Sequence, residues 1–187
     1  MRGHWKRRIA PVDPAHRVFV DESGVTTAMA RTRGRAPPGE RVAGVVPQGH
    51  WRTLTMLGAL RLDGMVAAAT VDAATDTDVF HSFVSQVLVP ALRPGDVVVW
   101  DNLAPHKAPR VRQELARAKA TLLPLPPYSP DLSPIEQCWS KVKQHVRDVA
   151  PRTVEALGRA AADGFARVTA SDARGWFKHC GHLCTPT

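Results

Sequence analysis

The sequence predicts an α/β fold in which a mixed sheet is flanked by helices. Residues 97–100 (VVVW) form an apolar run of the kind found in strands that are buried on both faces. Two further apolar segments meet at Asp63-Gly64, a dipeptide typical of hairpin turns. Around these strands, apolar residues recur at the helical spacing of three and four positions. Strands interspersed with such helices favour a sheet covered on its faces.

The first half of the chain supplies the hairpin of the expected sheet. Residues 1–16 look like a polar, basic lead-in. An apolar run at residues 17–20 predicts a buried strand that ends at Asp21, and the Gly/Pro/Arg-rich residues 31–49 predict an exposed loop or irregular hairpin. The remaining elements of this half are two hairpin strands and one helix with N-cap residues at its start, at residues 51–60, 61–70 and 76–91.

The second half alternates short strands with amphipathic helices. Residues 97–100 predict a central strand followed by Asp101, and residues 121–125 predict a second short strand. Asp101 would then lie at the carboxyl end of a central strand, where open α/β sheets place their sites. Helices are predicted, from the spacing of their apolar residues, at residues 109–119, 134–149, 153–168 and 171–178.

Composition and charge narrow the class of protein. The 187 residues, 44% of them hydrophobic, suit one domain with a real core, and no apolar run is long enough for a transmembrane helix. Three cysteines without framework spacing suit a reducing cytosol. The net charge of +8 divides into +6, −4 and +6 over residues 1–60, 61–101 and 102–187. Basic flanks around an acidic middle indicate a polyanion-binding protein, although Arg-rich coding alone would also raise the charge.

The most distinctive stretch is residues 123–139, LPLPPYSPDLSPIEQCW, in which five prolines precede or open a helix. Ser133 suits the N-cap and Pro134 the first helical position, and Glu136 stands three residues past the cap. Glu136 therefore has two interpretations. It completes a capping box with Ser133, or a rigid loop delivers it as a metal ligand of a nuclease-type site.

Asp21, Asp101 and Glu136 each stand at a predicted element boundary. Asp21 also suits a turn residue before Gly24. Three carboxylates brought together repel each other, and a divalent cation removes that cost. Two Mg²⁺ or Mn²⁺ ions about 3.5–4 Å apart can activate an attacking water or hydroxyl and stabilise the leaving oxygen of a phosphodiester. In a basic protein, the acids therefore predict two-metal chemistry on DNA.

Three stretches carry a family resemblance. They are VFVDESGV (residues 18–25), VVVWDNLAPHK (residues 97–107) and LPPYSPDLSPIEQCWSKVK (residues 125–143). Together they resemble the catalytic domain of the DDE transposases of the mariner-like insertion-sequence superfamily, and the 34 residues between Asp101 and Glu136 match that family's spacing. The resemblance implies a ribonuclease H-like fold and a metal-dependent DNA endonuclease and strand transferase. It also implies DNA transposition at the nucleoid, in the cytoplasm of a bacterial cell.

The resemblance assigns the metal-binding catalytic triad, residue by residue, to Asp21, Asp101 and Glu136. Asn102 follows Asp101 in the family pattern and is expected to orient it or a metal-bound water. His106 also matches the pattern and is expected near the scissile phosphate, with a local turn or core histidine as the alternative. Glu22 is left out of the triad because neighbouring side chains of a strand point to opposite faces.

The chain departs from the family at its amino-terminal end. Full-length members carry one or two helix-turn-helix units before the catalytic domain, whereas only the lead-in of residues 1–16 precedes the domain expected at residues 17–187. The helix-turn-helix domain is thus expected to be absent or to be separately encoded as a DNA-binding half. The alternative functions are a nuclease that cuts without strand transfer and a catalytically silent DNA-binding remnant of a transposase.

The expected partner is DNA, both the transposon ends and the target, bound by a homo-oligomer in the active complex and without a membrane. Two basic segments are expected to contact the DNA backbone, or else to form a solvated face. Their residues are Arg31, Arg33, Arg35, Arg41, Arg110, Arg112 and Lys119.

Overall fold

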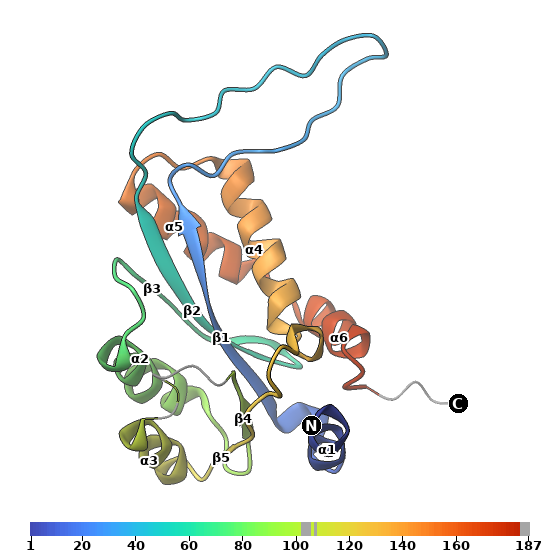
Figure 1. Ribbon diagram of the computed structural model, residues 1–187, viewed down its shortest axis with the longest axis vertical. Helices are drawn as coiled ribbons and strands as arrows, with labels where there is room; N and C mark the ends of the chain where they lie inside the picture. The colour runs from blue at the N-terminus through green and yellow to red at the C-terminus, as the bar shows by residue number, and fades with distance from the viewer. Residues whose placement is uncertain (102–105, 107, 184–187) are drawn as a thin grey trace.

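The centre of the molecule is a five-stranded sheet, seen in a computed structural model that describes residues 1–101, 106 and 108–183 (Figure 1). Its strands are β1 (Arg17–Thr26), β2 (Thr53–Arg61), β3 (Gly64–Val71), β4 (Val97–Val99) and β5 (Thr121–Leu122). They lie in the order β3-β2-β1-β4-β5. The pairs β1–β2 and β2–β3 are antiparallel, whereas β1–β4 and β4–β5 are parallel. The mixed sheet that the sequence predicts is confirmed.

The described residues form six α-helices, and these cover both faces of the sheet. They are α1 (Arg2–Ile9), α2 (Thr77–Phe83), α3 (Pro109–Arg117), α4 (Ile135–Val149), α5 (Val154–Ala166) and α6 (Ala170–His179). Side chains of α1, α4, α5 and α6 build one hydrophobic core, and those of α2 and α3 build a second core on the opposite face (Figure 1). Within this described part of the chain, no helix has both the length and the apolar character needed to cross a bilayer.

Successive side chains of β1 alternate between these two cores. Phe19 packs in the core beneath α4, whereas Val18 and Val20 pack in the core beneath α2 and α3. The same period of two directs Asp21 to the α4 face and Glu22 to the opposite face. The alternation thus gives the two neighbouring carboxylates different surroundings.

β1 is longer than the sequence predicts. The expected strand ends at Val20 and turns at Gly24, but β1 continues to Thr26 and holds Asp21 in its middle. Residues 19–26 pair one by one with residues 53–60 of β2. This ladder satisfies the backbone of a polar segment that carries little apolar signal. The prediction of Asp21 as a strand-end acid and its alternative as a turn residue are both wrong.

The amino-terminal residues form α1 where the sequence suggests only a polar lead-in. Trp5 and Ile9 are 5% and 4% exposed, and both pack in the core beneath α4. They stand four positions apart and so share one face of the helix. The composition of this segment does not predict a helix, because these two apolar residues are surrounded by basic ones.

The helix predicted at residues 76–91 is broken into three parts. Asp76 caps α2 as expected, but the α-helix ends at Phe83. A π-helical turn at Val84–Leu88 and a 3₁₀ turn at Val89–Ala91 follow it. Pro90 lies in the last turn, and its missing N–H prevents a regular continuation.

The remaining elements lie close to their predicted positions, with ends displaced by a few residues. The strand expected at residues 121–125 is shortened to β5.

The segment between β1 and β2, residues 27–52, makes a long excursion away from the sheet (Figure 1). Residues 31–46 are all exposed, and Val45 is 90% exposed. The prediction of an exposed loop at residues 31–49 is confirmed.

Candidate active site

Three of the predicted residues, Asp21, Asp101 and Glu136, line one pocket of about 470 Å³. Phe19 of β1 pairs with Val99 of β4, and Asp21 and Asp101 each stand two residues past this last pair of the parallel ladder. Glu136 comes from the first turn of α4. The proline-rich loop before α4 supplies most of the remaining wall. The structure therefore brings together three acids that are far apart in the sequence.

Asp21 is held by the indole of Trp139, whose Nε1 donates a hydrogen bond to Asp21 Oδ2 over 2.9 Å. Burial raises the pKa of the Asp21 carboxyl from 3.8 to about 7; the Trp139 hydrogen bond opposes the rise and the negative charge of Glu136 adds to it. The Asp21 carboxyl thus tends to keep its proton near neutral pH, because its charged form is buried beside another carboxylate. A bound cation would stabilise that charged form.

Gly58 makes room for this indole. It pairs with Asp21 across β1 and β2, and a Cβ at position 58 would lie 2.6 Å from the Trp139 ring and 2.8 Å from the Met65 methyl group. The methyl group ends a flexible side chain, but the indole is a rigid ring in a packed core. A glycine at this position therefore permits the contact between Trp139 and Asp21.

Gly58→Ala is expected to destabilise the fold by about 1–3 kcal/mol, the usual cost of overpacking a core. Urea denaturation measures the change. Gly24→Ala in β1 is the matched control, because its new Cβ would meet nothing nearer than Thr53 Cγ2 at 3.8 Å. Equal stability of the two variants would contradict the tight packing around Trp139.

Glu136 lies where the dipole of α4 favours a negative charge. α4, all of whose residues are described, begins without a side-chain N-cap, and the Ser133 backbone N–H donates to the Pro130 carbonyl over 2.9 Å. A capping box would need that N–H for the Glu136 carboxylate. The capping interpretation is therefore wrong, and the exposed Glu136 side chain lines the pocket instead.

A buried histidine joins Asp101 to Glu22. His106 Nδ1 lies 2.7 Å from Asp101 Oδ1, and His106 Nε2 lies 3.0 Å from Glu22 Oε2. The ring of His106 is 1% exposed and packs against Phe80 and Trp100, with centroid distances of 4.1 and 5.6 Å. Burial alone would lower the pKa of His106, but the carboxylates of Asp101 and Glu22 outweigh it and raise the pKa to about 9. The two carboxylates thus favour the protonated form of the imidazole.

His106 is expected near the scissile phosphate, with a local turn or core histidine as the alternative, and it lies in the core with one nitrogen facing Asp101. Asn102 lies outside the described residues. Glu22 points away from Asp21, as strand alternation predicts, yet it contacts the histidine. No local pattern reveals this contact, because it joins residues 84 positions apart.

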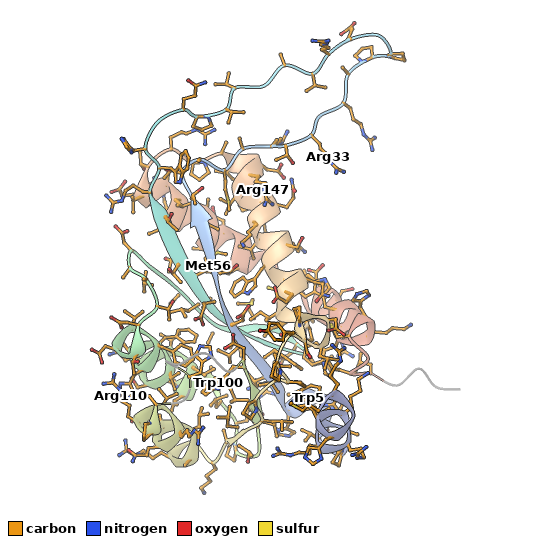
Figure 2. The ribbon with its side chains drawn as sticks, in the orientation of Figure 1. Trp5, Arg33, Met56, Trp100, Arg110 and Arg147 are labelled. Atoms are coloured by element: carbon orange, nitrogen blue, oxygen red, sulfur yellow. The ribbon has the colours of Figure 1, made fainter. Side chains whose placement is uncertain are left out.

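The predicted basic residues do not gather at the pocket. Figure 2 shows Arg33 on the long loop and Arg110 on α3, at opposite ends of the molecule. Arg31 Nε donates to Asp148 Oδ1 over 2.7 Å, and Arg110 forms an ion pair with Asp78. The other predicted basic residues are also exposed, and they are Arg35, Arg41, Arg112 and Lys119. They form two separate basic areas, one on the loop and one on α3.

The proline-rich loop presents an aromatic ring at the pocket. Tyr128 is 99% exposed and has a φ of 52°, a left-handed conformation that bulky residues rarely adopt. The Leu125 N–H anchors the loop by donating to the Trp100 carbonyl over 2.8 Å, and Asp131 pairs with Arg2 of α1. The anchored loop holds the ring open to solvent beside the three acids.

The donors that meet in the pocket suit a hard divalent cation. Three carboxylates supply only oxygen atoms, which Mg²⁺ and Mn²⁺ prefer. As the side chains stand, the part of the chain that the structure describes contains no group of three His, Cys, Asp or Glu residues able to hold a metal ion. The fit therefore depends on the chemistry of the converging donors and on the raised pKa of Asp21, not on a preformed cage.

Comparisons with known proteins identify related sequences. The family model of the DDE superfamily endonucleases matches residues 16–158. A curated relative, the transposase of the transposable element Tcb2 from Caenorhabditis briggsae, is 28% identical over 158 residues, which are 78% of this chain and 56% of the relative. The chain thus spans about half the length of that protein.

Solved structures of the Mos1 transposase share the fold. The Mos1 paired-end complex with the left transposon end has a TM-score of 0.78 at 15% identity, over 97% of this chain and 58% of that one. The catalytic domain of the Mos1 mariner transposase has a TM-score of 0.70 at 14% identity, over 97% of this chain and 86% of that one. At these identities the likeness shows the fold, and the expected ribonuclease H-like fold is confirmed.

Proposed function

Because the chain belongs to the DDE superfamily of endonucleases, we propose that it is the catalytic domain of a transposase. It would cleave DNA at the ends of a mobile element and join the freed 3′-hydroxyl to target DNA. The curated relative is named as a transposase, and the solved Mos1 structures include paired-end complexes with Mn and with Mg. The observation that carries the proposal is the pocket in which three acids meet from separate parts of the chain.

In this proposal Asp21, Asp101 and Glu136 hold Mg²⁺ or Mn²⁺, with two ions in the working site. Bound ions of this kind activate an attacking water or hydroxyl and stabilise the leaving oxygen of a phosphodiester. The protein's own groups support the acids: Trp139 orients Asp21 through its indole N–H, and the dipole of α4 favours the charge of Glu136.

DNA is the proposed partner, bound by a homo-oligomer at the ends of an element and at the target. The exposed arginines of the long loop and of α3 would contact phosphates, and the open ring of Tyr128 offers a face on which a base stacks. Recognition of a specific end sequence is assigned to a DNA-binding part outside these residues, on the same polypeptide or separately encoded. The proposed place of action is a bacterial nucleoid.

The test uses DNA that carries the two inverted repeats of the genomic element around the gene, incubated with the protein and Mg²⁺ or Mn²⁺. Cleaved and joined strands are the expected products of a transposase. Nicks without joined strands would identify a nuclease that lacks strand transfer. Salt-sensitive binding without cation-dependent cleavage would identify a silent DNA-binding remnant.

Glu136→Gln is expected to abolish cleavage, because glutamine keeps the size of the side chain and loses its cation-binding charge. The melting temperature should stay within about 2 °C of the parent, since exposed substitutions rarely change stability further. Glu155→Gln makes the same change in the first turn of α5 and should leave cleavage intact. Cleavage by Glu136→Gln at the parent's rate would exclude Glu136 as a ligand.

A further inference from the structure

Glu22 and His106 form a connected pair on the side of Asp101 that faces the core. Glu22 Oε2 lies 3.0 Å from His106 Nε2, and the other ring nitrogen lies 2.7 Å from Asp101 Oδ1. The side chains along this path are 15% exposed at Glu22, 1% at the histidine and 42% at Asp101. The path therefore runs from the interior of the protein to a carboxylate that solvent reaches.

Glu22 is not placed to bind a cation in the pocket itself. Strand alternation directs it to the face opposite Asp21, and the pocket is lined by Asp21, Asp101 and Glu136 without it. Its partner His106 packs against Phe80 and Trp100, which belong to the core beneath α2 and α3. The charge of Glu22 reaches Asp21 through space and adds to the rise of the Asp21 pKa, but any influence of Glu22 on the pocket by contact must pass through another residue.

The two residues of the pair are well fixed. Glu22 lies in β1 and pairs with Leu57 of β2 near the centre of the sheet. The ring of His106 is held between Phe80 and Trp100 at the distances given above. Asp101 lies two residues past Val99, the last residue of β4, and is not itself part of a strand. A carboxylate in such a position needs a partner if it is to keep one orientation.

We propose that Glu22 and His106 are positioning residues for the Asp101 carboxylate. Glu22 fixes the imidazole, and the imidazole turns the carboxylate toward the pocket and holds it there. The inference rests on the proposed function, in which Asp101 is a metal ligand. Partners that orient a metal ligand typically contribute 10–100-fold to metal affinity. Glu22 thus belongs to the cation-binding machinery without touching the cation.

The experiment measures Mn²⁺ binding to the full chain by isothermal titration calorimetry, with no DNA present. Glu22→Asp keeps the charge but withdraws it from His106 by one methylene, and it should weaken Mn²⁺ binding by about 10–100-fold. Glu22→Gln loses the charge but keeps an oxygen within reach of the imidazole. It should bind Mn²⁺ within about threefold of the parent, because removing a partner that orients a metal ligand costs more affinity than this. A long-range charge effect would give the reverse order and overturn the proposal.

Glu114 provides the matched control, because it is 19% exposed, faces His81 at 3.8 Å and Arg117 at 2.8 Å, and does not line the pocket. Glu114→Asp and Glu114→Gln should both bind Mn²⁺ like the parent. The melting temperatures of all variants distinguish a loss of Mn²⁺ affinity from a loss of fold stability. A Glu22→Asp protein that melts lower but binds Mn²⁺ normally would show that the pair is only structural, and would overturn the proposal.

A double variant tests the route through the histidine. His106→Ala should weaken Mn²⁺ binding, and adding Glu22→Asp to it should cause no further loss, because residues that act in series are not additive. Additive losses would place Glu22 on another route and overturn the inference. A parent protein that binds no Mn²⁺ would overturn the proposed metal site as well, so the two failures are distinguishable.

Discussion

Asp21→Asn should abolish cleavage and, in the presence of a chelator, make the protein more stable than the parent at pH 8. The physical reason is the buried position of the carboxyl, whose pKa rises from 3.8 to about 7 in the folded protein. Folding therefore raises the affinity of this group for a proton. At pH 8 the folded state must hold a charge that the unfolded chain exposes to water without cost.

The pH dependence has a definite sign. A carboxyl with a raised pKa in the folded state makes the protein less stable as the pH rises from about 4 to about 7, and the loss is complete above that range. Asparagine has no charge to bury, and its side-chain oxygen can still accept the Trp139 hydrogen bond. The expected gain at pH 8 is roughly 2–4 kcal/mol, and it should vanish near pH 4.

Urea denaturation at pH 4 and at pH 8 measures this difference. Asp163→Asn, a change of the same type at an exposed position of α5, should leave the pH dependence of stability unchanged. Loss of cleavage together with a gain in stability is the signature of a residue retained for chemistry. An Asp21→Asn protein that is less stable than the parent at pH 8 would contradict the burial of this charge.

Asp96→Asn should destabilise the fold by about 3–5 kcal/mol, the usual cost of breaking a buried ion pair from one side. Asp96 is 0% exposed and Arg61 is 2% exposed, and Arg61 Nη2 lies 2.5 Å from Asp96 Oδ2. Asp96 also accepts the backbone N–H of Arg93 over 2.9 Å and faces His16 Nδ1 over 2.9 Å. Without the carboxylate, a buried guanidinium would lose its counter-ion.

The double variant Arg61→Met/Asp96→Asn separates charge from packing. It removes both buried charges and keeps an oxygen that accepts the Arg93 N–H, so it should recover most of the lost stability. Denaturation by urea gives the free energy of unfolding for the parent, the two single variants and the double variant. If Asp96→Asn lost less than about 1 kcal/mol, the pair would be no more important than an exposed one.

The parts of the fold that follow local rules could be predicted from the sequence. α4 was predictable because its apolar residues repeat at helical spacing, and β4 because a run of valines suits a strand covered on both sides. The same local rules place Asp101 after β4 and Glu136 at the start of α4. The positions of two of the three pocket acids, Asp101 and Glu136, could thus be predicted from the local sequence.

The parts that depend on distant pairing could not be predicted in this way. β1 extends through the polar residues Asp21–Gly24 because β2 pairs with them, and nothing within β1 encodes the partner. The need for a glycine at position 58 arises only where Trp139 packs on the sheet. The contact between Glu22 and His106 likewise exists only after folding brings β1 and His106 together. Each of these features belongs to the tertiary structure alone.

The acids of the pocket are spread along the polypeptide, so the pocket can form only late in the synthesis of the chain. When β1 and β4 have been synthesised but α4 has not, the growing chain holds only two of the three carboxylates. Products of premature termination upstream of α4 share this deficit. Under the proposed function, fragments that end upstream of α4 therefore lack the third acid and should not cut DNA.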